Sequence, residues 1–231
     1  MIGGRRGIGA AVVQALTDQG FVVTYTYRTA PGDSPAPCRQ LDLADRAAVE
    51  AFAREQEDAP AWDAFVQVSG TTFDTLAAVM DQDAAEHVMQ VNHWAFARLA
   101  RAVVRPMLRA RSGRIVVVGS VMGLHASQGN VAYAASKAAL LSYARTLAIE
   151  SGKRGVTVNY VAPGFVDTAM LAPYAAYREG IAERIPAGRF ARPEEIAAVV
   201  AFLASPAAGY INGAYIPVDG GLTASLGIHR G

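Results

Sequence analysis

The stretch SVMGLHASQGNVAYAASK, residues 120–137, decides the fold and holds the most distinctive residue spacing in this chain. Tyr133 and Lys137 lie four residues apart in a segment of Ala, Ser and Leu that is predicted to be helical, so their side chains share one face. Ser120 follows the apolar run Ile115–Val118, which predicts a buried strand, and reactive groups gather at the ends of such strands in a parallel sheet. An ammonium group beside a phenol is expected to lower the pKa of the phenol, which suits proton transfer.

The composition describes a single domain with a large core. The chain has 231 residues, of which 52% are hydrophobic, and its formal net charge of +1 gives no electrostatic footprint for nucleic acid. The single cysteine, Cys38, excludes an internal disulfide and suits a reducing cytoplasm. The four histidines show no metal-ligand spacing and no apolar run is long enough to span a membrane, so we expect neither a metal site nor a membrane segment.

A glycine-rich turn opens the chain directly before a predicted helix, Ala10–Leu16. Glycines at such a place let backbone amides approach a pyrophosphate, and the helix N-terminus favours its negative charge. A dinucleotide fold needs a buried strand before this turn, and only Met1 and Ile2 precede it, so the first strand is largely missing from this sequence. The residues of the turn that we expect to bind a dinucleotide are Gly3, Arg5, Arg6, Gly7, Ile8 and Gly9.

The segment Phe21–Tyr27 is rich in β-branched and aromatic residues and is predicted to be the next strand. Enzymes that prefer NAD usually place an acid at the end of this strand, where Tyr27 and Arg28 stand here. Together with the arginines of the glycine turn, Arg28 offers a guanidinium group for a 2′-phosphate, which favours NADPH. Prolines in residues 29–37 predict a loop where a crossover helix is usual.

The rest of the chain alternates predicted strands and helices, which is typical of a single Rossmann-type, doubly wound α/β domain with a mainly parallel sheet. Asn92 lies inside a long predicted helix, where an asparagine needs a reason. A short helical lid is expected at residues 169–185. Further strands are expected at Cys38–Leu41, Ala64–Val68, Val156–Val161 and from Tyr215, and helices at 45–57 with Asp45 as cap, at Ala84–Ala110, at Ala132–Ser151 and from Arg192.

Five segments carry a family resemblance: GRIVVVGSVMG, NVAYAASKAALL, GVTVNYVAPGFVDTAM, IPAGRFARPEEIAAVVAFLAS and YINGAYIPVDGG. They resemble the short-chain dehydrogenase/reductases, and among these most of all the 3-oxoacyl-[acyl-carrier-protein] reductases. The resemblance implies that Asn92, Ser120, Tyr133 and Lys137 are the catalytic residues. Ser120 would polarise a ketone and Tyr133 would deliver its proton. Lys137 would hold the cofactor's ribose and lower the pKa of Tyr133, and Asn92 would hold a water for proton resupply.

The same resemblance implies further cofactor contacts. Asp42 and Leu43 would contact the adenine ring, Gly70 would permit close approach of the dinucleotide, and Tyr133 and Lys137 would touch the cofactor as well. The nicotinamide would lie in the turn formed by Pro163, Gly164, Val166 and Thr168. Two departures from the family pattern stand out, since Ile2 replaces a threonine and Gln67-Val68-Ser69 replaces Asn-Asn-Ala.

The implied activity is NADPH-dependent reduction of a 3-oxoacyl thioester, carried by an acyl-carrier protein, in fatty-acid or polyketide biosynthesis. Arg111 and Arg154 match positions at which such reductases present a basic contact near the active-site mouth. A cytoplasmic homotetramer is expected, in which the helices Ala84–Ala110 and Ala132–Ser151 pair across one two-fold axis and the Tyr215 strand pairs across another. Four residues of the lid either contact an acyl chain or only pack the lid onto the body: Met170, Leu171, Tyr174 and Tyr177.

Two other functions remain open. The same catalytic residues serve any secondary alcohol or ketone, so an oxidoreductase of another substrate class is an alternative. The missing first strand and the altered residues 67–69 favour a non-catalytic, nucleotide-binding partner subunit. The complete set of catalytic residues argues against this second alternative.

Overall fold

The computed structural model describes residues 1–225, so residues 226–231 of the predicted domain, which we expected to span 1–231, lie outside the described part. The strands form parallel ladders throughout. The main sheet has the order β3 (Ala64–Gln67), β4 (Gly113–Val118), β5 (Val156–Pro163) and β6 (Tyr215–Val218). A separate parallel pair consists of β1 (Tyr25–Tyr27) and β2 (Cys38–Gln40).

Residues 1–4 join these two sheets into one. On the β3 side, the N–H of Ile2 donates to the Val66 carbonyl at 2.8 Å and the carbonyl of Ile2 accepts from the N–H of Val68 at 3.0 Å. On the β1 side, the carbonyl of Met1 accepts from the N–H of Thr26 at 3.0 Å. The little that is present of the first strand therefore lies between β1 and β3 and preserves the spatial order of a doubly wound sheet.

The predicted strand Phe21–Tyr27 is shorter in the structure, where only Tyr25–Tyr27 is a strand. Met1 reaches back only to Thr24, to whose carbonyl its nitrogen donates at 2.7 Å, so in the described residues no part of the central strand accompanies Phe21–Val23. Extended backbone without a paired neighbour is not held as a strand, and this explains the difference. Residues 29–37 form the predicted loop, which folds back so that the N–H of Gly32 meets the Tyr25 hydroxyl at 3.1 Å.

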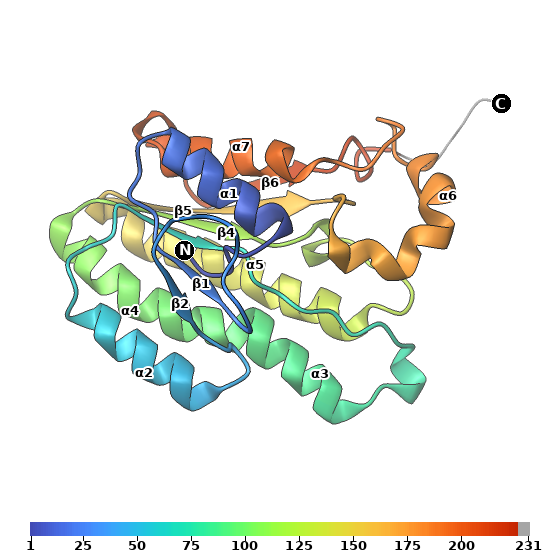
Figure 1. The fold of residues 1–231 in the computed structure, drawn as a ribbon, viewed down its shortest axis with the longest axis horizontal. Helices are drawn as coiled ribbons and strands as arrows, with labels where there is room; N and C mark the ends of the chain where they lie inside the picture. The colour runs from blue at the N-terminus through green and yellow to red at the C-terminus, as the bar shows by residue number, and fades with distance from the viewer. Residues whose placement is uncertain (226–231) are drawn as a thin grey trace.

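Helices cover both faces of the sheet (Figure 1). On one face lie α1 (Gly7–Asp18) and α7 (Pro193–Ala204), and on the other lie α2 (Arg46–Glu57), α4 (Ala95–Ala110) and α5 (Val131–Ser151). Each face has its own cluster of buried apolar side chains against the strands. This three-layer arrangement confirms the predicted fold class.

The long helix predicted at Ala84–Ala110 is interrupted by one wider turn. α3 (Gln82–Met89) passes into a π-helical turn, Gln90–Trp94, which continues into α4. Such turns are usually single and often lie at functional sites. Asn92 lies inside this turn, which gives the unusual mid-helix asparagine a structural setting.

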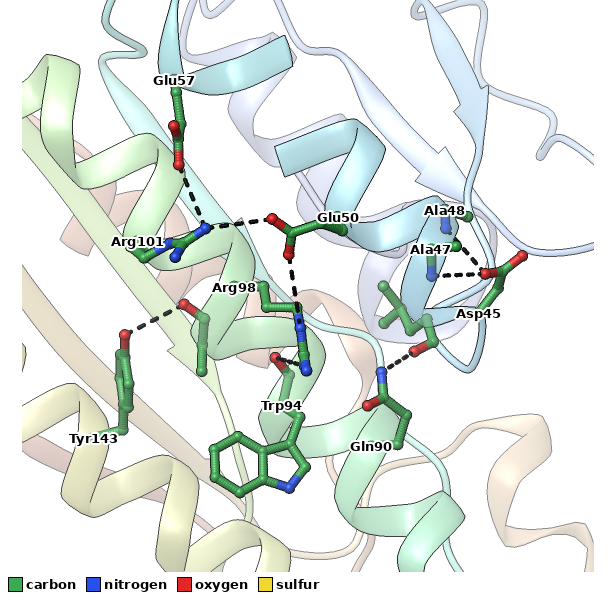
Figure 2. A network of polar contacts seen from close by, with 12 residues as sticks. Asp45, Ala47, Ala48, Glu50, Glu57, Gln90, Trp94, Arg98, Arg101 and Tyr143 are labelled. Atoms are coloured by element: carbon green, nitrogen blue, oxygen red, sulfur yellow. Dashed lines mark hydrogen bonds and ion pairs between the residues drawn. The ribbon is translucent and has the colours of Figure 1, made fainter. Parts of the chain in front are cut away.

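A cap and a set of ion pairs fix α2 against α4 (Figure 2). Asp45 caps α2 as predicted, because its carboxylate accepts two hydrogen bonds of 2.9 Å from backbone N–H groups of the first turn. Figure 2 shows Glu50 of α2 between Arg98 and Arg101 of α4, at N–O distances of 3.9 and 3.5 Å. These groups are partly exposed, so each pair adds little stability and mainly sets how the two helices lie together.

The predicted lid at residues 169–185 consists of a 3₁₀ segment, Ala169–Tyr177, followed by the short helix α6 (Arg178–Ala182). Arg178 holds the lid to Asp167 through two hydrogen bonds of 2.9 and 2.8 Å. In residues 1–225, no helix has the length and apolar character needed to cross a membrane. Other 3₁₀ turns are found at Ala77–Val79, Val121–Gly123, Gly152–Arg154 and Pro206–Ala208.

Candidate active site

Ser120 lies directly beyond the carboxyl end of β4, as predicted, and is buried. Its backbone N–H donates to the Tyr160 hydroxyl at 3.0 Å, and its Oγ accepts from the N–H of Met122 at 3.2 Å. A Cβ at Gly119 would lie 1.8 Å from the Tyr160 ring, so this position requires glycine. Sequence reasoning missed Tyr160 on β5, although a tyrosine in a strand predicted to be buried signals a polar partner inside the core.

Tyr133 and Lys137 share one face of α5, as their spacing predicts. The Nζ of Lys137 lies 5.5 Å from the centre of the Tyr133 ring. Lys137 is 3% exposed, and the side chain of Ser120 lies close enough to the Tyr133 hydroxyl to act on its pKa. The structure therefore brings three of the four predicted catalytic side chains to one point.

The fourth, Asn92, is fully buried, and its side-chain amide is engaged at both ends. The Oδ1 accepts from the N–H of Thr71 at 2.8 Å, while the Nδ2 donates to the Thr71 carbonyl and to the Oγ of Ser136, both at 2.9 Å. These bonds tie the segment after β3 to α5 through the π-helical turn. Thr71 and Ser136 hold the site in place, and sequence reasoning missed both.

Gly70 lies where these groups meet. A Cβ on Gly70 would be 3.2 Å from both the Oδ1 of Asn92 and the Nζ of Lys137, so a side chain there would crowd both. Residues 67–69, which depart from the family pattern, precede Gly70, and the hydrogen bonds of Gln67 are only partly satisfied. The Nε2 of Gln67 donates to the Ser69 carbonyl at 3.0 Å, while the buried Oε1 of Gln67 has no partner within residues 1–225.

The pKa of Tyr133 corrects one expectation. Burial raises this pKa above its usual value, the side chain of Ser120 opposes the rise, and the charge of Asp74 adds to it. The expected lowering by Lys137 is wrong for this structure, because burial disfavours both charged forms and lowers the pKa of Lys137 to about 8. Tyr133 is therefore protonated at neutral pH, which is the state that a proton donor needs.

The glycine turn forms a cradle at the N-terminus of α1. Gly3 has a φ of 87°, and a Cβ there would lie 2.1 Å from the Oγ of Ser69. A Cβ on Gly9 would lie 1.9 Å from the carbonyl oxygen of Gly3. Only glycines allow this close turn, which leaves the helix start accessible to an anion. The cradle therefore fits the pyrophosphate of a dinucleotide.

The predicted nicotinamide turn lies beside this cradle. Pro163 ends β5, and the N–H of Gly164 donates to the Val218 carbonyl at 3.1 Å. Val166 is buried, and a Cβ on Gly7 would lie 3.0 Å from the Cγ2 of Thr168. Thr168 is thus in place to meet a phosphate held by the glycine turn, as the resemblance implies.

The predicted base-binding residues lie at the ends of β1 and β2. Arg28 follows Tyr27 at the end of β1 and is exposed. Arg5 joins the glycine turn to this point, because its Nη1 donates to the Thr29 hydroxyl at 2.9 Å. Of the predicted adenine contacts, Asp42 is exposed and Leu43 is buried, as is typical of the floor of a base site. Arg6 is exposed as well.

Arg111 and Arg154 do not lie at the mouth of their own chain's site, which corrects the expectation for a single subunit. Arg111 precedes β4 and Arg154 precedes β5, so both lie at the amino edge of the sheet, whereas Ser120 lies at its carboxyl edge. The six residues of β4 separate the two edges by about 20 Å. The two arginines do lie near each other, since the Nη2 of Arg111 donates to the Lys153 carbonyl at 3.3 Å.

The lid closes onto the segment that carries Thr71. The Tyr174 hydroxyl donates to the Asp74 carboxylate, and this bond raises the pKa of Tyr174 to about 12. The N–H of Thr75 donates to the Gly129 carbonyl at 2.7 Å, which holds the same segment to the loop before α5. Sequence reasoning missed Asp74, because an acid in a loop has no distinctive spacing.

A glycine cradle for a dinucleotide beside buried Ser, Lys and Asn side chains and a half-buried Tyr defines a Rossmann-type oxidoreductase that uses a nicotinamide cofactor. No cluster of potential metal ligands occurs in residues 1–225. The family model described as enoyl-(acyl carrier protein) reductase matches residues 2–223. The chain belongs to the short-chain dehydrogenase/reductase family, of which this model is a branch.

Curated relatives and solved structures agree with this assignment. The 3-oxoacyl-[acyl-carrier-protein] reductase FabG of Salmonella typhimurium is 36% identical over 95% of this chain and 94% of its own length. The MabA reductase of Mycobacterium bovis is 38% identical over 95% and 90%. A putative NAD(P)-dependent gluconate 5-dehydrogenase from Beutenbergia cavernae, with bound NADP, has a TM-score of 0.92 and 36% identity over 97% of this chain and 95% of that one. A gluconate 5-dehydrogenase from Burkholderia cenocepacia, in complex with NADP and tartrate, has a TM-score of 0.89 and 27% identity over 97% and 94%.

Replacing Lys137 with Met is expected to stabilise the protein in the absence of ligands. Burial lowers the pKa of Lys137 from 10.5 to about 8, so folding at neutral pH carries the cost of burying an ammonium group. We expect the free energy of unfolding at pH 7 to rise by on the order of 1–3 kcal/mol. The folded protein releases this proton near pH 8 and the unfolded chain near 10.5, so the wild type gains stability between these values and the advantage of Lys137→Met shrinks there.

Urea unfolding from about pH 7 to about pH 10 measures this effect. Lys153→Met, which removes the exposed lysine at the far edge of the sheet, is the matched control and should show no such change with pH. A Lys137→Met protein less stable than the wild type at pH 7 would show that burial of the ammonium carries no cost.

Proposed function

We propose that this protein reduces the ketone of a 3-oxoacyl thioester to the secondary alcohol, with NADPH as the hydride donor. The observation that carries the proposal is the placement of Ser120, Tyr133, Lys137 and Asn92 at one buried point beside the glycine cradle. Relatives named 3-oxoacyl-[acyl-carrier-protein] reductase, which match 95% of the chain, support the substrate class.

Ser120 and Tyr133 act together on the oxygen of the ketone. Their hydroxyls lie close enough for Ser120 to act on the pKa of Tyr133, so a carbonyl oxygen bound between them would meet both. When bound, the nicotinamide cofactor supplies the hydride that the carbonyl carbon accepts. Tyr133 gives its proton to the oxygen, and Ser120 stabilises the negative charge that develops there.

Lys137 and Asn92 serve these two hydroxyls. The ammonium group of Lys137 holds the ribose hydroxyls of the cofactor and compensates the tyrosinate left after proton transfer. The side chain of Asn92 is fully bonded to Thr71 and Ser136. We therefore assign the binding of the water for proton resupply to the backbone carbonyl of Asn92. Its side chain then acts as a positioning group.

The lid offers the surface for the acyl chain. Met170 is 47% exposed and Tyr177 is 68% exposed, and Leu171 lies between them in the chain. Tyr174 is committed to Asp74 and so holds the lid closed. We assign the first three residues to contact with the acyl group and Tyr174 to closure.

The carrier-protein contact and the tetramer become one proposal. α4 and α5 both run from the carboxyl edge of the sheet to its amino edge. A two-fold axis across these helices places them antiparallel, and it moves Arg111 and Arg154 of a partner subunit toward the carboxyl edge of this one. An acidic carrier protein docked on one subunit would then serve the site of its neighbour.

The strand β6 lies at the open edge of the main sheet and is the proposed second interface. We also propose the cytoplasm as its location, in line with the single cysteine.

A second candidate is oxidation or reduction of another secondary alcohol or ketone, such as a sugar acid. The specific support is the close match in shape to solved structures titled as gluconate 5-dehydrogenases. The Asp74 carboxylate near Tyr133 argues against it, because a negative charge there repels the carboxylate of such a substrate.

Substrate class and the proton donor are tested together. We expect turnover of NADPH with 3-oxoacyl thioesters and little with 5-ketogluconate, and Tyr133→Phe should lower that turnover by about 10²–10⁴-fold because it removes the proton donor. Tyr210→Phe, which removes the hydroxyl of a fully exposed tyrosine, is the control for loss of a phenol alone. Faster turnover of 5-ketogluconate than of every thioester would favour the second candidate. A Tyr133→Phe protein with near wild-type chemistry would remove Tyr133 from the mechanism.

The preference for NADPH is tested by titrating both cofactors. Arg5, Arg6 and Arg28 should favour NADPH over NADH by on the order of 1–3 kcal/mol through contacts with the 2′-phosphate. Arg28→Glu should remove most of this difference, since it places an acid where NAD-dependent enzymes have one. Arg46→Glu makes the same charge change on α2 and should leave it unchanged. Equal binding of NADH and NADPH by the wild type contradicts the assignment.

The shared site for a carrier protein is tested by reversing charge at Arg111 and Arg154 together. Turnover of a carrier-bound substrate should fall several-fold and depend less on salt, while turnover of a small soluble thioester should stay the same. Arg46→Glu with Arg54→Glu makes the same charge change on α2 and is the control. Light scattering on each protein reports the assembly. An active monomer would contradict the geometry, because one subunit alone keeps these arginines about 20 Å from its site.

A further inference from the structure

The lid is tied back to the turn from which it starts. The predicted nicotinamide turn, residues 163–168, ends at Thr168, and the 3₁₀ segment of the lid begins with the next residue. Arg178, the first residue of α6, reaches back over 11 residues and donates two hydrogen bonds to the Asp167 carboxylate, at 2.9 and 2.8 Å. Figure 1 shows α6 apart from the helices that cover the sheet. Arg178 therefore closes this part of the lid into a loop whose two ends meet at the nicotinamide turn.

The same guanidinium group lies against an aromatic stack. The central carbon of the Arg178 guanidinium is 4.6 Å from the centre of the Phe190 ring. Phe190 is buried, and its ring is stacked on that of Phe165, with 5.5 Å between the ring centres and 24° between the planes. Phe165 belongs to the nicotinamide turn. Arg178 thus contacts the turn directly through Asp167 and indirectly through Phe190.

The backbone of the nicotinamide turn is bonded to the residue that follows this stack. The N–H of Ala191 donates to the Phe165 carbonyl at 2.9 Å, and the N–H of Asp167 donates to the Ala191 carbonyl at 2.8 Å. Val166 lies between these two bonds, pairs with Ala191 in an isolated parallel bridge and is buried. The place of Val166 therefore depends on how Asp167 and the segment of Phe190 and Ala191 are held.

Stability alone does not account for the ion pair between Arg178 and Asp167. Their side chains are 48% and 56% exposed, and ion pairs this exposed contribute little to the free energy of unfolding. The two parallel hydrogen bonds do fix the direction of both side chains. The guanidinium group also holds the pKa of Asp167 below its usual value, so the pair is charged at neutral pH. Such a pair is suited to placing a backbone segment.

We propose that Arg178 is a positioning residue for the nicotinamide half of the cofactor. It reaches from the lid to Asp167 and Phe190, and so keeps Val166 in place for the nicotinamide ring. This inference rests on the cofactor site described above and does not depend on the substrate proposed for the protein.

Two ligands separate the nicotinamide half from the rest of the cofactor. NADPH contains both halves, whereas 2′-phospho-ADP-ribose lacks the nicotinamide and keeps the adenine, the 2′-phosphate and the pyrophosphate. Arg178→Met keeps most of the length of the side chain and removes the guanidinium group. In calorimetric titrations, we expect this variant to bind NADPH at least roughly threefold more weakly than the wild type, and 2′-phospho-ADP-ribose within about twofold of it. A loss of folded protein would lower the number of binding sites and leave the ratio of the two affinities unchanged.

A second arginine provides the matched control. Arg39 combines an ion pair with Glu55 and a contact with the Phe52 ring, at 5.0 Å from its centre, and its side chain is 52% exposed. Arg39→Met should leave the ratio of the two affinities unchanged. Arg178→Lys keeps the charge but loses the paired hydrogen bonds, so it should also weaken the binding of NADPH and not that of the fragment.

The outcomes separate this inference from the cofactor site on which it rests. Unchanged affinity of Arg178→Met for NADPH, or equal weakening of both ligands, would overturn the role of Arg178. A wild-type protein that binds NADPH no more tightly than 2′-phospho-ADP-ribose would instead overturn the nicotinamide turn itself, and the role of Arg178 with it.

Discussion

The main-chain hydrogen bonds of the first four residues are the constraint on which the rest of the structure depends. The backbone of Ile2 is hydrogen-bonded to Val66 and Val68 at β3, and the carbonyl of Met1 accepts from Thr26 of β1. In the part of the chain that the structure describes, these bonds connect the β1–β2 pair to the main sheet. They also place Gly3 against Ser69, where the glycine turn begins. The dinucleotide cradle and the catalytic residues thus lie at the same edge of the sheet, because residues 1–4 are hydrogen-bonded between β1 and β3.

The active site is built at a cost to stability. Within residues 1–225, Lys137 is buried without an acidic partner, and burial acts against its charge. Asn92, Thr71 and Ser136 satisfy one another and surround this ammonium with fixed dipoles, which keeps the site rigid. Such unpaired buried charge is typical of a place that is arranged for a ligand rather than for the folded state alone. In the proposed function, the ribose hydroxyls of the cofactor would be the partner that this lysine lacks.

Local spacing was sufficient to predict most of the fold and the proximity of Ser120, Tyr133 and Lys137, while the catalytic roles of these residues and of Asn92 come from the family resemblance and stay predictions. Tyr133 and Lys137 lie as their helical interval requires, and Ser120 lies at a strand end because an apolar run and a glycine precede it. Long-range features were not predictable in this way. The shortened strand at Phe21–Thr24 depends on a neighbour that is far away in sequence, and the raised pKa of Tyr133 depends on burial by several elements. Arg111 and Arg154 each precede a strand, so they lie at the amino edge of the sheet. A motif match compares residues along the sequence and does not show at which edge of the sheet they lie.

The hydroxyl-to-carboxylate contact between Tyr174 and Asp74 has a consequence for Tyr133 as a proton donor. The lid cannot lift unless this bond breaks, and Asp74 belongs to the segment that Asn92 holds through Thr71. In the closed state, burial and the charge of Asp74 both keep the proton on Tyr133. Movement of residues 169–185 away from Asp74 would expose the phenol to water and weaken both effects. The pKa of Tyr133, and so its strength as a proton donor, is therefore tied to the contact between Tyr174 and Asp74.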